Sequence, residues 1–124
     1  GVHMVNLLLF SAIAQASDVY EICRHEKQVW NDRQQQFETD YVSTFYSRVP
    51  LQLIIHENLF EINRDRREIK NKFETDDQQC WREHANSTLC YNESLKKFEW
   101  DFYSYNGKVT RDVMSVCFIN GEPI

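Results

Sequence analysis

The sequence predicts an all-α fold, a disulfide-linked bundle of four to five helices, two of them long and two or three short. Three observations carry this prediction. Apolar residues recur in steps of three and four over most of the 124 residues, which is the spacing of an amphipathic helix. No glycine occurs from residue 2 to residue 106, so the glycine turns that join many β-hairpins are missing there. No stretch shows a strand-like alternation bounded by turns, although Phe118-Ile119 comes closest.

The first long helix is predicted over residues 18–49. Asp18 and Glu21 have the spacing of a capping box, which indicates a helix start. Pro50 disfavours helical geometry in the residue before it, so the helix ends there. The predicted buried stripe follows the 3.6-residue period of a helix and consists of Val19, Ile22, Cys23, Val29, Trp30, Phe37, Tyr41, Phe45 and Val49.

The second long helix is predicted over residues 50–73, because Pro50 suits a first helical turn, where its missing N–H costs nothing. Its opposite face carries basic residues interleaved with acidic ones. One interpretation of the basic residues is a heparin or lipid-headgroup site, and the favoured one is a solvated face with acidic partners. The apolar stripe is Leu51, Ile55, Leu59, Ile62, Ile69 and Phe73.

Shorter elements are predicted in the last part of the chain. A short helix covers residues 76–84, and a polar loop follows over residues 85–92. A fourth helix over residues 95–105 ends at Asn106-Gly107, which fits a glycine C-cap. A last helix runs from about residue 110 to residue 119.

The predicted organisation is a tag scar plus an apolar segment over residues 1–16 and a single helical domain over residues 17–124. Gly1-Val2-His3 resembles the remnant of a removed tag. The residues from Met4 to Ala16 are apolar and end on the small-x-small triplet of a signal-peptide cleavage site, but no basic residue precedes them. A signal peptide and an extra helix of the fold are equally favoured. The segment is too short to span a bilayer, so no transmembrane span is expected.

Two features predict an extracellular, secreted protein. Asn86-Ser87-Thr88 and Asn92-Glu93-Ser94 are both N-glycosylation sequons, which predict glycans at Asn86 and Asn92 on a surface loop. The chain has four cysteines and no C-x-x-C pair, which favours two disulfides over a redox or zinc site.

All four cysteines fall at one end of the predicted bundle, and all three pairings stay open. The preferred pairing joins Cys23 to Cys117, because that bridge closes nearly the whole domain, and Cys80 to Cys90, across the glycosylated loop.

The sequence shows no pattern of residues typical of catalysis. His25-Glu26 and His56-Glu57 lack the second histidine of a zincin site. Cys80 and His84 share a face of the predicted helix, where they could bind a metal or form a Cys–His pair. The favoured interpretation is that Cys80 forms a disulfide and His84 faces solvent. The net charge of −5 disfavours nucleic-acid binding. We therefore expect no enzymatic activity, no metal and no cofactor.

The tip between the two long helices is the predicted interaction surface. It is rich in large apolar residues, whereas a water-facing connection is usually polar. Either the apolar segment of residues 7–10 covers it, or a protein partner or a second copy of the chain docks there. The surface consists of Phe45, Tyr46, Leu51, Leu53, Ile54 and Ile55.

The favoured function is that of a secreted helical interaction protein, which binds a protein partner or receptor or forms a dimer. The alternative is an extracellular carrier of an apolar small molecule or lipid, because an aromatic-rich core can be hollow. Aromatic residues make up 14% of the chain.

Overall fold

The computed structural model describes residues 17–44, 51–103 and 109–124, and these residues form strands and no helix. The prediction of an all-α helical bundle is therefore wrong. The strands are β1 Asp18–Asn31, β2 Gln36–Thr44, β3 Leu51–Ile55, β4 Leu59–Ile62, β5 Asp65–Glu74, β6 Gln78–Glu83, β7 Ser87–Asn92, β8 Lys97–Tyr103, β9 Val109–Ile119 and β10 Glu122–Pro123.

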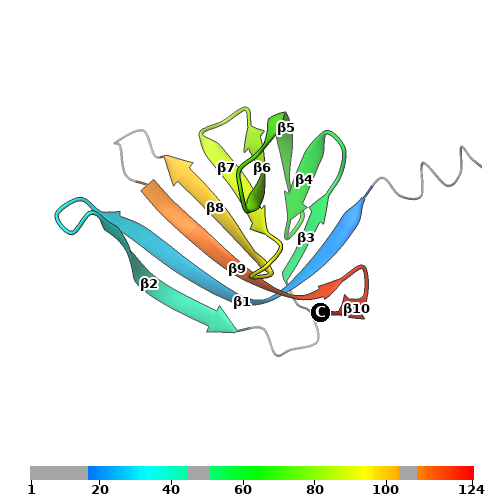
Figure 1. The fold of residues 1–124 in the computed structure, drawn as a ribbon, viewed down its shortest axis with the longest axis horizontal. Coiled ribbons are helices and arrows are strands. Elements are labelled where there is room, and N and C mark those ends of the chain that lie inside the picture. The colour runs from blue at the N-terminus through cyan, green and yellow to red at the C-terminus, as the bar shows by residue number, and fades with distance from the viewer. Residues whose placement is uncertain (1–16, 45–50, 104–108) are drawn as a thin grey trace, which may run out of the picture.

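Eight of these strands close into an antiparallel β-barrel (Figure 1). Consecutive strands from β3 to β9 pair with one another, and β1 closes the ring by pairing with both β3 and β9. One edge of β1 pairs with two strands: residues 18–22 pair with β3, and residues 24–31 pair with β2. β2 and β10 therefore lie outside the ring of eight, and β2 forms a hairpin with β1.

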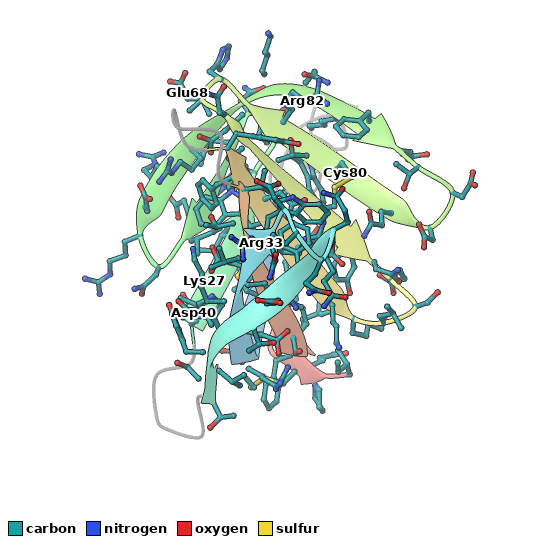
Figure 2. All side chains as sticks on the ribbon, turned by 90° about the vertical axis from the view of Figure 1, so that its left-hand side faces the viewer. Lys27, Arg33, Asp40, Glu68, Cys80 and Arg82 are labelled. Atoms are coloured by element: carbon teal, nitrogen blue, oxygen red, sulfur yellow. A yellow bond between two sulfur atoms is a disulfide. The ribbon has the colours of Figure 1, made fainter. Side chains whose placement is uncertain are left out.

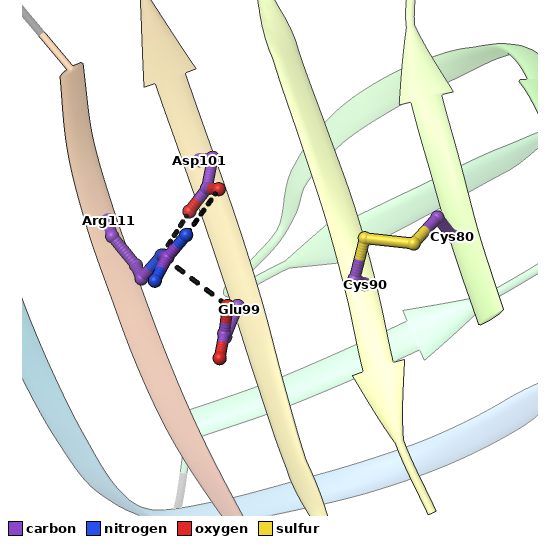
Figure 3. Close-up of a disulfide and its surroundings, with 5 residues drawn as sticks. All are labelled: Cys80, Cys90, Glu99, Asp101 and Arg111. Atoms are coloured by element: carbon purple, nitrogen blue, oxygen red, sulfur yellow. Dashed lines mark hydrogen bonds and ion pairs between the residues drawn. A yellow bond between two sulfur atoms is a disulfide. The ribbon is translucent and has the colours of Figure 1, made fainter. Parts of the chain in front are cut away.

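Strand β8 shows the period of two that a barrel wall requires. Phe98 and Trp100 are buried, whereas Glu99 and Asp101, which follow them in turn, are only partly buried and form ion pairs with Arg111 on β9 (Figure 3). Alternate side chains of a strand lie on opposite faces of the sheet. Phe98 and Trp100 of the predicted fourth helix therefore line the interior of a barrel.

A bulge in β1 contributes to the helix-like spacing of its sequence. Cys23 has no partner in the register with β9, which passes from Ile22 opposite Val116 to Arg24 opposite Ser115. A bulge inserts one residue into a strand, so a step of two between inward-facing positions becomes a step of three. The inward-facing residues that follow the bulge are His25 and Lys27. Because they are polar, this part of the strand does not alternate between apolar and polar residues.

Residues other than glycine make the tight turns of three hairpins, β1–β2, β4–β5 and β7–β8. Gln35, Asn63, Arg64 and Lys96 all have positive φ angles, between 49° and 74°. These three hairpins therefore need no glycine, although residues with a side chain adopt positive φ angles less readily than glycine does. The lack of glycine up to residue 106 therefore did not exclude a barrel.

Each element predicted as helix or loop contains one to three strands. The region of the first long helix contains β1 and β2, and the second contains β3, β4 and β5. The predicted helices at residues 76–84, 95–105 and 110–119 correspond to β6, β8 and β9, and the predicted loop at residues 85–92 contains β7.

The apolar core occupies part of the barrel interior. Its fully buried members come from six different strands and pack into one cluster together with Ile62, Trp81, Tyr91, Trp100 and Val116. These six are Ile22, Leu53, Phe60, Leu89, Phe98 and Met114. Burial of these side chains from opposite walls holds the ring closed.

Two disulfides reinforce the barrel wall. Cys23 on β1 joins Cys117 on β9, and Cys80 on β6 joins Cys90, its direct partner on β7 (Figure 3). This is the pairing that the sequence analysis preferred, although neighbouring strands rather than one end of a bundle bring the cysteines together. The described residues contain no helix long and apolar enough to cross a membrane. Residues 1–16, predicted as a tag scar and apolar segment, lie outside the described residues.

Candidate ligand-binding site

The register of β1, β8 and β9 places charged side chains inside the barrel. Lys27 lies opposite Asp112, and Asp112 lies opposite Trp100. Directly opposed residues in antiparallel strands share a face of the sheet, and Trp100 packs in the core. Lys27 and Asp112 therefore face inward, as does His25, which lies opposite the buried Met114. Lys27 is labelled in Figure 2, which views the molecule from the side of the β1–β2 hairpin.

Asp112 is the centre of the first group of inward charges. Its Oδ1 lies 2.6 Å from Nε2 of His25, and its Oδ2 lies 3.4 Å from Nζ of Lys27. The residue is only 8% exposed. A buried carboxylate needs such partners because removal from water disfavours its charged form.

Arg67 on β5 organises a second group. Its guanidinium contacts Asp65 at 2.7 Å and Glu83 at 3.3 Å, and it lies over the ring of Trp100, 5.4 Å from the centroid. Its hydrogen bonds to Asp65 are the main cause that raises the pKa of Arg67 above its ordinary value. The guanidinium is thus a fixed positive charge held against an aromatic wall.

An open hollow of about 410 Å³ adjoins these two groups. Arg67 and Asp112 both line it, together with the rings of Trp100 and Phe102. Lys27 also lies over Phe102, with Nζ 5.8 Å from the ring centroid. The described residues that line the hollow, which is called the charged cavity below, are Lys27, Asp65, Arg67, Trp100, Phe102, Tyr103, Thr110 and Asp112.

Two buried groups extend this arrangement. The indole Nε1 of Trp100 donates a hydrogen bond to Oγ of Ser87 at 3.0 Å, which fixes the ring that forms the cavity wall. Glu83 is 3% exposed, and one of its carboxylate oxygens contacts Arg67. The other, Oε2, is buried and has no hydrogen-bond partner among the described residues.

Two other hollows are less developed as sites. One of about 350 Å³ lies beside Tyr20, His56 and Lys72, where burial raises the pKa of Tyr20 to about 12. Another of about 470 Å³ lies beside the β6–β7 turn, with Asn86 and Tyr103 in its lining. Neither lining contains a charged side chain as deeply buried as Asp112.

The predicted interaction surface does not exist as a helical tip. Leu53 belongs to the core with no exposed surface, and Leu51 and Ile55 pack against that core. Ile54 is half-buried in β3, and Phe45 and Tyr46 lie outside the described residues. Cys80 is in a disulfide and His84 is exposed, so a thiol–imidazole pair is absent.

The two sequons differ in exposure, and this difference leads to a prediction. Asn86 is exposed in the β6–β7 turn, whereas Asn92 is 8% exposed and its Oδ1 accepts a hydrogen bond from the Leu95 N–H at 3.0 Å. A glycan on Asn92 must leave this buried position, so chains that carry one fold less readily. In protein secreted by a eukaryotic host, peptide mapping after glycosidase treatment is expected to find higher occupancy at Asn86. Equal or higher occupancy at Asn92 contradicts this expectation.

Sequence reasoning missed the charged residues of the interior. His25-x-Lys27 and Asp65-x-Arg67 place charges two apart in segments now known to be strands, so each pair shares one face. Such a spacing is a usable signal only once the strands are known, because in a helix these residues point in different directions. The described residues contain no group of three or more potential metal ligands.

Comparisons of the chain with protein-family models, with curated proteins and with solved structures found no match. The geometry of the charged cavity is therefore the basis for the function proposed below.

Proposed function

We propose that this protein binds a small organic molecule in the charged cavity of the barrel and acts as an extracellular carrier or scavenger of that molecule. The observation that carries the proposal is the set of inward-facing charges around a cavity of about 410 Å³. Cavities of this size are typical of small-ligand sites, and an eight-stranded barrel has room for side chains or for one small ligand.

The energetic cost of these charges supports a binding role. When a buried ion pair is replaced by apolar residues of similar volume, the protein is often as stable as before or more stable. Lys27, Arg67 and Asp112 line the cavity beside the rings of Trp100 and Phe102, and the buried Glu83 contacts Arg67. Departures from a simple apolar core concentrate at functional sites.

The lining also narrows the kind of ligand. Trp100 and Phe102 offer two aromatic rings, with centroids 4.3 Å apart, and the same lining contains charged side chains. This combination favours a molecule with a flat apolar part and a polar or charged group over the wholly apolar ligand or lipid considered from the sequence. The proposal concerns binding, and it includes no catalytic step.

A fragment screen followed by NMR tests this proposal. Binding fragments are expected to shift the indole N–H resonance of Trp100 and the amide resonances of Thr110 and Asp112. Thr110→Trp places a large side chain in the cavity lining and is expected to abolish these shifts. Thr39→Trp, on the exposed face of β2, is the control and leaves them unchanged. Fragments that shift only residues outside the cavity contradict the proposal.

A specific observation favours a second function, binding of a protein partner or of a second copy of the chain. Among the described strands β2 pairs with β1 alone, and it exposes Tyr41 and Val42. An unpaired strand edge can accept another strand. If copies of the chain associate here, Val42→Lys is expected to shift the mass measured by light scattering from dimer to monomer. A mass unaffected by Val42→Lys contradicts this.

A further inference from the structure

The two bases that line the charged cavity carry hydrogen-bond donors that no described residue uses. A lysine ammonium has three N–H donors, and the only described contact of Nζ in Lys27 is with Oδ2 of Asp112, at 3.4 Å. A guanidinium has five, of which Arg67 donates two to Asp65 and one to Glu83. Both bases are partly exposed, Lys27 at 26% and Arg67 at 32%. The cavity therefore offers unused N–H donors to a ligand.

The carboxylates of the lining, by contrast, already have partners. The two oxygens of Asp112 contact His25 at 2.6 Å and Lys27 at 3.4 Å. One oxygen of Asp65 accepts two hydrogen bonds from Arg67, and the side chain of Asp65 is 56% exposed, so water can bind its other oxygen. The hydrogen-bonding groups that remain unused inside the cavity are thus donors, which favours a ligand that presents acceptors.

The charges of the lining balance one another, and this disfavours an ionic ligand of either sign. The described lining residues include two bases and two carboxylates, and each base contacts a carboxylate. A cation finds both oxygens of Asp112 occupied. An anion can reach Lys27 or Arg67 only beside the carboxylates that these bases contact, at 3.4 and 2.7 Å, and like charges repel at such distances. An uncharged acceptor meets neither obstacle.

The donors lie beside the aromatic rings of the lining. Nζ of Lys27 is 5.8 Å from the centroid of the Phe102 ring, and Cζ of Arg67 is 5.4 Å from the centroid of the Trp100 ring. The centroids of these two rings are 4.3 Å apart. An acceptor bound by either base therefore lies close to an aromatic ring, and a flat group joined to that acceptor can pack against the ring.

We propose that the ligand of this cavity is an uncharged flat molecule, an aromatic group that carries a carbonyl, whose oxygen accepts a hydrogen bond from Lys27. The inference rests on the binding function proposed above and specifies its ligand class. Lys27 is the principal donor because its one described contact is long, whereas hydrogen bonds to two carboxylates hold the guanidinium of Arg67 in place. The aromatic group then packs against Trp100 and Phe102.

Four flat probes of nearly the same size test this ligand class: acetophenone, 2-phenylpropene, benzoate and benzamidinium. In 2-phenylpropene a CH₂ group replaces the carbonyl oxygen of acetophenone, and the two ions carry opposite charges. Dissociation constants are measured by following the Trp100 indole resonance, which is assigned with Trp100→Phe. Acetophenone is expected to bind about tenfold tighter than 2-phenylpropene, because a hydrogen bond to a charged group contributes roughly that much. It is also expected to bind tighter than either ion.

Lys27→Met keeps most of the apolar stem and removes the donor, so it is expected to remove most of the preference for acetophenone over 2-phenylpropene. Lys97→Met is the matched control, because Lys97 lies on β8 and is not among the described residues that line the cavity. This control is expected to keep the preference.

A second variant covers the case in which Lys27→Met does not fold. Lys27→Met leaves Asp112 with His25 as its one described partner. Lys27→Met combined with Asp112→Leu replaces the whole ion pair by apolar side chains, a change that proteins often tolerate. The double variant is expected to show the same loss of preference.

The outcomes separate this inference from the binding function beneath it. If 2-phenylpropene or either ion binds as tightly as acetophenone, or if a folded variant without Lys27 keeps the preference, the carbonyl inference is overturned and the cavity remains a binding site. If none of the four probes shifts the Trp100 resonance at millimolar concentration, the binding function is overturned as well.

Discussion

Replacement of both Cys23 and Cys117 by serine is expected to lower the free energy of unfolding by about 4–5 kcal/mol. The bridge spans 94 residues of sequence, and a disulfide restricts the unfolded chain more as the loop that it closes lengthens. It also joins β1 to β9, the two strands whose pairing closes the ring. Folded domains are stable by only about 5–15 kcal/mol, so this variant is expected to be close to unfolding at body temperature.

The matched control is the second disulfide. Cys80 and Cys90 are 10 residues apart and form a direct cross-strand pair within one hairpin, so serine at both positions is expected to cost less, about 3 kcal/mol or below. Urea unfolding of both double variants, followed by circular dichroism without reductant, gives the comparison. A larger loss for the Cys80 and Cys90 variant argues against the loop-length explanation.

The disulfides were predictable from the sequence, and the strands between them were not. An even number of cysteines without C-x-x-C pairs favours two bridges in either fold, and the long bridge is favoured by its loop length whatever elements it joins. The secondary structure depends instead on which face each side chain occupies. In β1 the bulge at Cys23 and the inward His25 and Lys27 disturb the apolar alternation that would identify a strand.

The candidate site could not be predicted from the sequence for a related reason, since its residues come together only through strand pairing. His25 and Asp112 are 87 residues apart and meet only because β1 pairs with β9. Arg67 and Glu83 meet through the pairing of β5 with β6. In the predicted bundle, Arg67 belonged to a solvated helix face with acidic neighbours. It does contact acidic residues, but it does so within a barrel whose strands turn it inward.

The charged cavity and the apolar core share side chains, and this connects stability with binding. Trp100 packs in the core cluster, holds Arg67 against its face and donates a hydrogen bond to Ser87. Because the ring is fixed on several sides, the cavity wall is rigid before a ligand arrives. A site that is already ordered loses less conformational entropy on binding, so under the proposed binding function we expect the core beneath the cavity to contribute to affinity without touching the ligand.

The neighbouring residues Leu53 and Ile54 give the most direct test of the barrel. Leu53 has no exposed surface and packs in the core, whereas Ile54 is half-buried and points to the other face of β3. Leu53→Ser is therefore expected to lower the free energy of unfolding by about 3–5 kcal/mol, because it removes buried methyl groups, leaves a cavity and buries a hydroxyl.

Ile54→Ser is the matched control, with the same new side chain one position further along. It is expected to cost about 1 kcal/mol or less, because the serine hydroxyl on the outer face remains accessible to water. Thermal unfolding of both variants, with light scattering to record their size, measures the difference. Adjacent residues on opposite faces of a strand must differ in this way, whereas a surface at a helical tip needs both side chains for docking and neither for folding. Similar small losses of stability for the two variants, with a change in association state for both, contradict the barrel packing of β3.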